Sequence, residues 1–254
     1  MEINKIYNEN CLDTMARMED NFIDLTVTSP PYDNLRKYNG YSFDFESIAK
    51  ELYRITKEGG LVVWVVGDAT IKGSESLTSF RQALFFKEIG FNVHDTMIYR
   101  KTNPNPVMGA RYKQCFEYMF VFSKGKPKTF NPIQLDCENT KGFVKCFIGE
   151  KDGVKQYVNK KRNKKKNIDN IFEYKTVRNK ETKKHSAVFP EQLANDHIIS
   201  WSNENDLVYD PFMGSGTTAK MAKKNNRNYI GSEISAEYCD IIKQRLENNE
   251  LNLL

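Results

Sequence analysis

Apolar positions along most of the chain follow two alternating patterns. Some segments carry apolar residues every three to four positions, which is typical of amphipathic helices, and others are short continuous apolar runs, which are typical of buried strands. These patterns predict strands at 5–7, 22–27, 61–66, 93–99, 118–122, 207–209 and 229–231, and helices at 12–18, 45–55, 79–89, 190–201, 217–225 and 236–246. Strands that alternate with helices favour a mainly parallel sheet with helices on both faces. The predicted fold class is therefore α/β.

The middle of the chain departs from this pattern. Residues 126–184 have few periodic apolar positions and several charges, so we expect an inserted, loop-rich subdomain there. A chain of 254 residues can hold one large α/β domain with such an insertion. The expected organisation is a first half at 1–125, the insertion at 126–184 and a second half at 185–254.

Positive charge is concentrated in the insertion. Between Lys155 and Lys184 there are twelve Lys or Arg against three acidic residues, a balance of +9 that leaves −4 for the rest of this +5 chain. Such a block indicates a polyanionic partner, and a solvated lysine-rich loop is the alternative. The candidate contacts to nucleic acid are Lys160, Lys161, Arg162, Lys164, Lys165 and Lys166.

Composition excludes several other classes of protein. No apolar run is long enough to span a bilayer, and the first residues lack the pattern of a signal peptide, so we expect a cytoplasmic protein without membrane contact. The five cysteines are scattered and include no C-x-x-C pair, which argues against a disulfide framework and a zinc site. We expect reduced thiols and no bound metal.

A five-residue segment, Thr-Ser-Pro-Pro-Tyr from Thr28 to Tyr32, directly follows the predicted strand at 22–27. Pro30 and Pro31 lack a backbone N–H and have fixed φ, so the loop can neither extend the strand nor form a helix. Its oxygens and its aromatic ring are therefore held in place. Such a set of groups suits the binding of a planar heterocycle through its exocyclic amino group.

A second motif lies near the end of the chain. Asp-Pro-Phe-Met-Gly-Ser-Gly-Thr-Thr, from Asp210 to Thr218, connects a predicted strand to a predicted helix. Gly214 and Gly216 allow backbone angles that a side chain forbids and let a ligand approach the main chain. Glu233, just after the next strand, can accept hydrogen bonds from ribose hydroxyls. These features predict a nucleoside pocket.

A plain tight turn and a nicotinamide enzyme are the competing interpretations of this glycine pattern. Asp210 shifts the balance, because a carboxylate at the end of the strand repels a pyrophosphate and suits a cationic ligand such as S-adenosylmethionine. No Walker lysine follows the glycines, which argues against a nucleoside triphosphate site.

With the Ser29–Tyr32 and Asp210–Gly216 motifs in this order, the chain resembles the amino-group DNA methyltransferases of bacteria and phages, in their β arrangement. The resemblance covers nearly the whole chain. It implies a Rossmann-like, seven-stranded, mainly parallel sheet with helices on both faces. It also implies S-adenosylmethionine as methyl donor, S-adenosylhomocysteine as product and a base flipped out of double-stranded DNA. Residues 126–184 match the position of the target-recognition region.

The same resemblance implies the site residues. The catalytic set is Ser29, Pro30, Pro31 and Tyr32. The cofactor set is Asn10, Cys11, His185, Ser186, Ala187, Phe189, Asp210, Pro211, Phe212, Gly214, Ser215, Gly216, Thr217 and Glu233. Asn10 stands where the family usually carries an aspartate near the adenine ring of the donor, and an amide can still bond the adenine amino group.

The chemistry follows from these roles. Ser29 and the Pro30 carbonyl would accept the two N–H bonds of the target amine and localise its lone pair, while Tyr32 stacks on the flipped base. Serine at the first motif position is usual for cytosine-N4 enzymes of the family and aspartate for adenine-N6 enzymes, so we favour cytosine N4. An adenine-N6 DNA methyltransferase is the first alternative. A methyltransferase for RNA or protein glutamine and a catalytically inactive DNA-specificity module are the others. A cognate restriction endonuclease and a monomeric or homodimeric state stay open.

Overall fold

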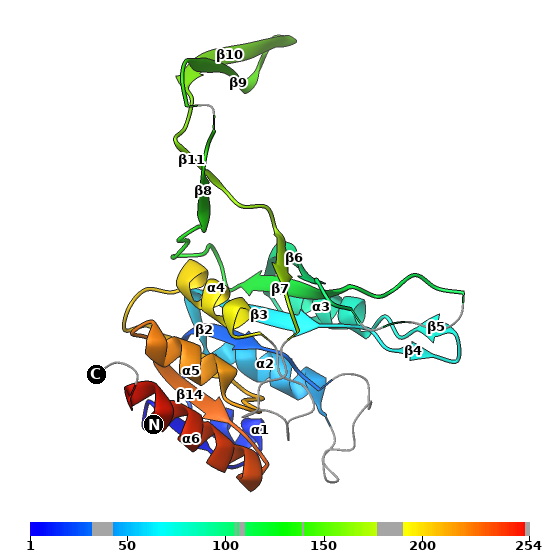
Figure 1. Cartoon of the computed structure of the whole chain (residues 1–254), viewed down its shortest axis with the longest axis vertical. Coiled ribbons are helices and arrows are strands. Elements are labelled where there is room, and N and C mark those ends of the chain that lie inside the picture. Colours follow the sequence, from blue (N-terminus) through cyan, green and yellow to red (C-terminus); the bar gives the residue numbers. More distant parts are fainter. Residues whose placement is uncertain (32–42, 105, 107–109, 139, 177–189, 252–254) are drawn as a thin grey trace. The chain divides into compact units, whose positions relative to one another are not determined.

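The computed structural model describes residues 1–31, 43–104, 106, 110–138, 140–176 and 190–251. Contacts between residues divide the chain into two compact units (Figure 1). The larger unit is formed by Met1–Asn131 together with Asn170–Leu254, and the smaller unit is Pro132–Asp169. Residues 126–131 and 170–176 of the predicted insertion therefore belong to the larger unit.

The larger unit is built on one main sheet. Its strands are β1 (Lys5–Tyr7), β2 (Ile23–Thr28), β3 (Thr56–Val66), β6 (Asn92–Lys101), β7 (Phe116–Ser123), β12 (Ile171–Tyr174), β13 (Leu207–Asp210) and β14 (Asn228–Ser232). They lie in the order β1-β14-β13-β2-β3-β7-β6-β12, and all neighbours are parallel except at β7, which is antiparallel to β3 and β6. The mainly parallel sheet is confirmed. In the described residues it has eight strands rather than seven, because β12 pairs with β6 at one edge.

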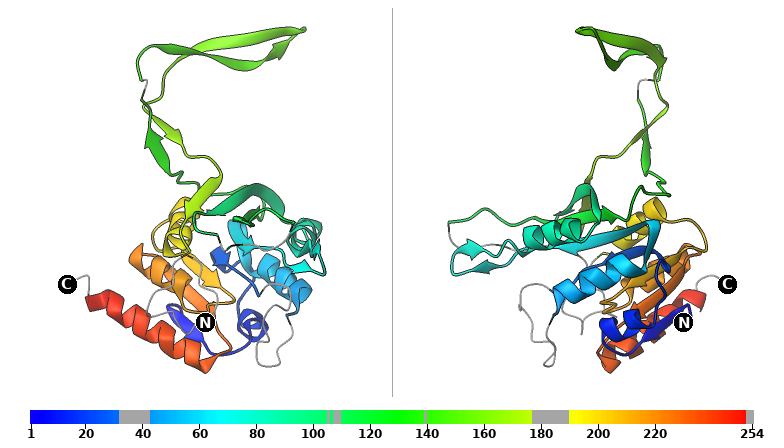
Figure 2. Two further views of the ribbon diagram at one scale, coloured as in Figure 1. Left: turned by 45° about the vertical axis from the view of Figure 1, so that its right-hand side comes forward. Right: turned by 180° about the vertical axis from the view of Figure 1, so that it is seen from behind.

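Helices form a layer on each face of this sheet (Figure 2). They are α1 (Cys11–Ala16), α2 (Phe45–Ile55), α3 (Thr78–Glu88), α4 (Glu191–Trp201), α5 (Thr217–Lys224) and α6 (Ala236–Leu251), and a short hairpin of β4 (Thr70–Ile71) and β5 (Ser74–Glu75) precedes α3. In one layer α2 packs between α1 and α3, and in the other α5 packs between α4 and α6. In the described residues every helix is too short or too polar for a membrane span.

The apolar run of β3 is continuous because both faces of the sheet are covered. Val62, Trp64 and Val66 pack into one core cluster with α1, α2 and α3, whereas Val63 and Val65 are equally buried and lie outside that cluster. Alternate side chains of one strand thus point into two layers of the core, as expected for a parallel sheet between helices. The strand begins at Thr56 rather than at 61 as predicted, because Thr56 takes an extended conformation directly after α2.

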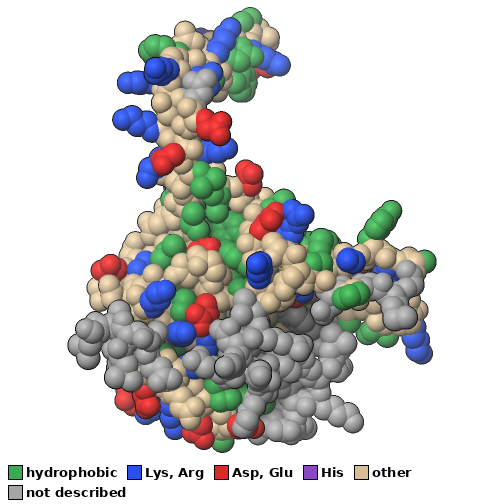
Figure 3. All heavy atoms as spheres, viewed as in Figure 1, with side chains coloured by type: hydrophobic (Ala, Val, Ile, Leu, Met, Phe, Trp, Pro, Cys, Tyr) green, Lys and Arg blue, Asp and Glu red, His purple; other side chains and the backbone are tan. Residues whose placement is uncertain are grey.

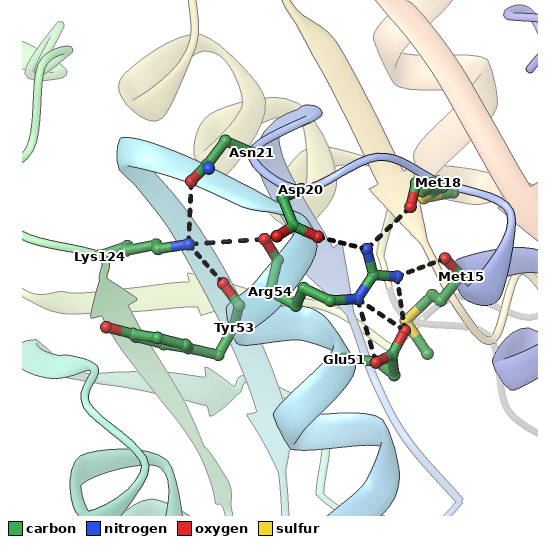
Figure 4. Close-up of polar contacts among 8 residues, drawn as sticks. All are labelled: Met15, Met18, Asp20, Asn21, Glu51, Tyr53, Arg54 and Lys124. Carbon is green, nitrogen blue, oxygen red and sulfur yellow. Dashed lines mark hydrogen bonds and ion pairs between the residues drawn. The ribbon is translucent and has the colours of Figure 1, made fainter.

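Two cations hold the ends of α1 and α2 (Figure 4). Arg54 donates to the carbonyl oxygens of Met15 and Met18 at 2.7 and 2.8 Å and also pairs with two carboxylates. Lys124, after β7, donates to the carbonyl oxygen of Tyr53 at 2.8 Å. Carbonyls at helix ends lack partners within the helix, and cations stabilise them. This cluster therefore stabilises the scaffold of the larger unit.

The smaller unit consists of two antiparallel pairs. One pair is β9 (Phe143–Lys151) with β10 (Val154–Lys161), and the other is β8 (Gln134–Asp136) with β11 (Lys165–Asn167). The prediction of a loop-rich segment was wrong for these residues. A two-stranded ribbon exposed on both faces needs no buried apolar side, so its sequence lacks the period of two on which strand prediction depends.

Candidate active site

The two sequence motifs meet at the carboxyl edge of the sheet, where the C-terminal ends of its parallel strands lie. β2 and β13 are parallel neighbours with Leu25 opposite Val208, so both strands end at the same edge. The chain leaves β2 toward β3 on one side and leaves β13 toward β14 on the other, which makes this edge a topological switch point, where ligands bind in open α/β sheets. At the strand ends the Thr28 hydroxyl donates to Asp210 Oδ1 at 2.6 Å. Ser29 and Pro211 each follow directly, so the motifs begin side by side.

Asp210 is a buried carboxylate whose oxygens already accept protein hydrogen bonds. Besides Thr28, Phe212 N donates to Oδ1 at 3.0 Å and the Thr218 hydroxyl donates to Oδ2 at 2.8 Å. Burial raises the pKa of Asp210 to about 6, and these three donors oppose the rise. Asp210 therefore connects the end of β2 with the end of β13 and the start of α5. A direct contact to the methyl donor stays a prediction.

The glycine turn is shaped by close approaches. Gly214 and Gly216 have φ of +53° and +80°, and a Cβ at Gly216 would lie 2.9 Å from the Ile242 side chain. Gly214 N donates to Glu233 Oε2 at 2.7 Å, and Ser235 N donates to Glu233 Oε1 at 2.8 Å. Burial raises the pKa of Glu233. Backbone N–H groups of Ser235, Gly214 and Ile234 oppose this rise, and the carboxylate can still accept a further donor such as a ribose hydroxyl.

The same turn is held from α6 and α4. The guanidinium of Arg245, only 3% exposed, donates to the carbonyl and, at 3.0 Å, to the hydroxyl oxygen of Ser215. Arg245 also forms an ion pair with Glu191 at 2.7 Å, and Lys220 contacts the same carboxylate at 2.8 Å. The two cations lower the pKa of Glu191 against the effect of its burial. Ser215 thus connects the turn to Arg245 through both its carbonyl and its hydroxyl oxygen.

Four further residues of the predicted cofactor set lie at the start of α1 or between β13 and the first turn of α5. Asn10 caps α1 by accepting from Leu12 N at 2.9 Å. Cys11 is buried, and burial raises the pKa of its thiol to about 12, so the thiol is protonated at neutral pH. Phe212 packs edge-on against Trp64 with ring centroids 6.3 Å apart. Thr217 is 3% exposed, and its hydroxyl has no hydrogen-bond partner in the described part of the chain.

The catalytic loop is described only at its start. Ser29 and Pro31 are half-buried and Pro30 is buried. Tyr32 of the predicted catalytic set lies outside the described residues, as do four of the predicted cofactor set, His185, Ser186, Ala187 and Phe189.

All five cysteines are free thiols, as predicted. Within the described ranges no group of His, Cys, Asp and Glu side chains could hold a metal ion.

The six candidate contacts to nucleic acid lie on the smaller unit. Lys160 and Lys161 are in β10, Lys165 and Lys166 are in β11, and Arg162 and Lys164 lie between these strands. All six are exposed, so their charges are available to a partner. Contact with nucleic acid stays a prediction for each of them.

Known proteins with similar sequences are DNA methyltransferases. The sequence model of a family described as DNA methylase matches residues 23–244. The chain belongs to this DNA methylase family. It is 57% identical over 241 residues to the orphan methyltransferase M.BamHII of Bacillus amyloliquefaciens, with 89% of each chain covered. It is 29% identical over 269 residues to the type II methyltransferase M.BglII of Bacillus subtilis, covering 97% of this chain and 71% of M.BglII.

Solved structures show the same fold. The cytosine-N4-specific PvuII DNA methyltransferase superposes with a TM-score of 0.71 at 21% identity, covering 95% of this chain and 85% of that one. The complex of M1.HpyAVI with SAM superposes with a TM-score of 0.67 at 25% identity, covering 95% of this chain and 98% of that one. The predicted Rossmann-like arrangement is thus shared with solved methyltransferases.

Sequence reasoning missed the supporting residues of this DNA methylase. The sequence identifies Thr28 only as the start of the loop and Thr218 only as the end of the glycine motif, yet both hydrogen-bond to Asp210. Arg245 and Glu191 gave no signal, because they lie 30 and 24 residues from Ser215 on amphipathic helices where charges are ordinary. A pattern of threonines next to both motifs was the one available hint.

Proposed function

We propose that this DNA methylase transfers a methyl group from S-adenosylmethionine to the exocyclic amine of a base flipped out of double-stranded DNA, with cytosine N4 as the target. The observation that carries the proposal is the 2.6 Å hydrogen bond from Thr28 to Asp210. It joins the end of the strand that leads into Ser29–Pro30–Pro31 to the start of the glycine turn. A methyl donor at the turn and an amine at the loop would then lie side by side.

The residues of the turn fit S-adenosylmethionine, which supplies an electrophilic methyl group when bound. The Glu233 carboxylate has lone-pair capacity for a ribose hydroxyl beyond the backbone bonds that fix it. The Thr217 hydroxyl, buried and unpartnered within the described residues, can satisfy its hydrogen-bonding capacity on a polar part of the donor. Asp210, when ionised, places a buried negative charge near a sulfonium, where the low dielectric strengthens the attraction.

Ser29 and Pro30 would act on the target amine. The amino nitrogen of cytosine or adenine is a poor nucleophile because its lone pair is delocalised into the ring. A hydroxyl and a carbonyl that accept its two N–H bonds favour a pyramidal nitrogen and stabilise the charge that develops during attack. Tyr32 would stack on the flipped base, which is worth about 1–3 kcal/mol for a base on an aromatic ring. Methyl transfer is then governed mainly by positioning.

The choice of cytosine over adenine rests on the serine at position 29. Serine is a weaker acceptor than aspartate, and both bases present an amine to the same two oxygens. Adenine N6 is the alternative target of the same mechanism. A catalytically inactive specificity module is disfavoured, because a fixed Glu233 and an intact glycine turn have no use without a nucleoside ligand.

Partner and location follow from the DNA substrate. We propose action in the cytoplasm, as a monomer or homodimer. A cognate restriction endonuclease is the expected partner of a type II enzyme. The 57% identity to a relative named an orphan methyltransferase favours an enzyme that works without one. Failure to find an endonuclease activity with the same recognition sequence in the source cells would support the solitary enzyme.

The deciding experiment is mass spectrometry of nucleosides from DNA treated with the enzyme and isotopically labelled S-adenosylmethionine. N4-methylcytosine is expected, N6-methyladenine would reassign the base, and no product would refute the activity. Ser29→Ala should lower turnover by about tenfold or more, because a group that stabilises the transition state is lost, while calorimetric affinity for S-adenosylmethionine stays unchanged. Normal turnover of this variant would remove Ser29 from the mechanism.

A further inference from the structure

The ribbon formed by β9 and β10 leaves large apolar side chains in solvent. Phe143 is 69% exposed, Phe147 57% and Tyr157 45%. A lone two-stranded hairpin is marginally stable in water, and exposed aromatic rings on it add no folding energy. Large exposed apolar side chains that are grouped mark an interaction surface. The ribbon is therefore built to contact a partner.

The pairing of the two strands assigns the aromatic rings to one face of the ribbon. Residues opposite each other in an antiparallel pair point to the same side, and side chains alternate along each strand. We define the aromatic face by the pairs Tyr157 with Phe147, Asn159 with Lys145, and Lys161 with Phe143. The opposite face carries the pairs Val158 with Cys146 and Lys160 with Val144. Gln156 precedes Tyr157 in β10 and therefore points to the opposite face as well, whereas a bulge in β9 shifts the register between Phe147 and Gly149.

Contacts within the aromatic face are specific. The rings of Phe147 and Tyr157 meet edge to face with centroids 5.7 Å apart, and Lys145 Nζ lies 4.8 Å from the centre of the Tyr157 ring. A cation over an aromatic ring holds its stem along the apolar surface and keeps its charge available. The face thus combines an ordered aromatic pair with fixed positive charge and the amide of Asn159.

Charge selects the class of partner. The smaller unit, Pro132–Asp169, carries ten Lys or Arg and five acidic residues, so its net charge of +5 equals that of the whole chain. In Figure 3 basic side chains lie beside hydrophobic ones on this unit. A second copy of the ribbon would bring +5 against +5, which disfavours self-association through this face. A polyanion gains from both the charges and the rings.

Shape selects the groove. A two-stranded ribbon fits the major groove of B-DNA, where each base pair presents a distinct pattern of donors and acceptors, whereas the minor groove is about half as wide. An asparagine side chain can bond adenine N6 and N7 together in that groove, and lysine can bond guanine O6 and N7. Asn159 and Lys145 are opposite each other at the centre of the aromatic face.

We propose that the β9–β10 ribbon enters the major groove with its aromatic face toward the base edges, and that Asn159 reads an adenine of the recognition sequence. Phe147 and Tyr157 pack against the apolar edges of neighbouring bases, and Lys145 and Lys161 contact acceptors on bases or phosphates. This inference rests on the proposed function, because it assumes a DNA substrate, and it adds the groove, the face and the residue that select the sequence.

The test replaces each purine of the mapped target site by its 7-deaza analogue, which removes one acceptor from the major groove and leaves the minor groove intact. Affinity for each duplex is measured with the full chain by fluorescence anisotropy in the absence of methyl donor. At one adenine the substitution should weaken binding by about fivefold to a hundredfold, the range of one bidentate base contact. The corresponding 3-deaza analogue, which removes an acceptor from the minor groove, should have no effect.

Asn159→Ala should lose this sensitivity, so that its affinity is the same with and without the 7-deaza base. Gln156→Ala is the matched control, since it is another exposed amide of β10 on the opposite face, and it should keep the full sensitivity. Sensitivity to 3-deaza rather than 7-deaza bases would overturn the groove. Equal behaviour of the two variants would overturn the face. Binding without methyl donor separates these results from the proposed function, which fails instead if no methylated nucleoside forms.

Discussion

Replacing Thr28 with valine removes one hydrogen bond and preserves the shape of the side chain. The hydroxyl is fully buried and donates to Asp210 at 2.6 Å, the main polar link between the end of β2 and the end of β13. A hydrogen bond to a charged group contributes about 1.5–3 kcal/mol, and the carboxylate that loses a donor stays buried. We expect Thr28→Val to lower the free energy of unfolding by about 2 kcal/mol at pH 7.5.

The structure supplies a matched control two residues earlier on the same strand. Thr26 is as buried as Thr28, and its hydroxyl has no hydrogen-bond partner among the residues that the structure describes. Thr26→Val makes the same chemical change on the same face of the strand. It should leave stability unchanged or raise it slightly, because an unsatisfied buried hydroxyl is removed.

The pH dependence identifies the mechanism. Burial raises the pKa of Asp210 to about 6, so the folded protein holds a charged carboxylate above pH 6 and a neutral one below it. The hydrogen bond from Thr28 is strongest to the charged form. The destabilisation by Thr28→Val should therefore fall from about 2 kcal/mol at pH 7.5 to about 1 kcal/mol at pH 5, the value for a neutral hydrogen bond.

The assay is urea denaturation followed by tryptophan fluorescence, with both variants and the unmodified protein measured at each pH. Trp64 is fully buried in the core cluster and reports on the larger unit. Equal losses for Thr28→Val and Thr26→Val would show that the strand tolerates no valine for reasons of packing. A loss that does not change between pH 7.5 and pH 5 would refute the charged partner.

Four further predictions follow from the same edge of the sheet and from the insertion. The raised pKa of Asp210 means that the folded protein holds a proton which the unfolded chain releases, so it adds about 3 kcal/mol of stability below pH 4 that is lost as pH rises to 6. Asp210→Asn should remove this pH-dependent component. Parallel pH profiles of the two proteins in urea denaturation would contradict this prediction. Gly216→Ala should lower the free energy of unfolding by about 1–3 kcal/mol, because Gly216 has a φ of +80° and a Cβ there would contact α6. Gly73→Ala is the control, since Gly73 has a φ of +81° and open space around it, and it should lose only the part due to the backbone angle. Equal destabilisation of the two variants in thermal unfolding would disprove the contact. Glu233→Gln should weaken binding of S-adenosylmethionine about tenfold to a hundredfold by calorimetry, and unchanged affinity would remove Glu233 from the pocket. Charge reversal within residues 160–166 should weaken DNA binding at all sequences and flatten its salt dependence, and an unchanged slope would make these residues a solvated segment.

The candidate site was predictable where one short segment carries the information. The glycine turn needs two residues with positive φ within three positions, and glycine adopts such angles freely. Gly214 and Gly216 therefore predict the turn from the local sequence alone. The double proline after β2 is equally local. Helix and strand positions in the larger unit were predictable because their buried faces impose a period on the sequence.

The sequence by itself therefore determined the elements of the larger unit, the order of its two motifs and the chemical groups that each motif presents. Only the tertiary structure decided which distant side chains complete the site. Thr28 and Asp210 are 182 residues apart, and Arg245 reaches Ser215 from a helix 30 residues away. Such pairs leave no periodic signal, because a single polar contact between two elements depends on how the sheet orders them. The ribbon of β9 and β10 escaped prediction for a related reason. Neither of its faces is buried within the protein, so its sequence need not alternate between apolar and polar residues as a strand with one buried face does.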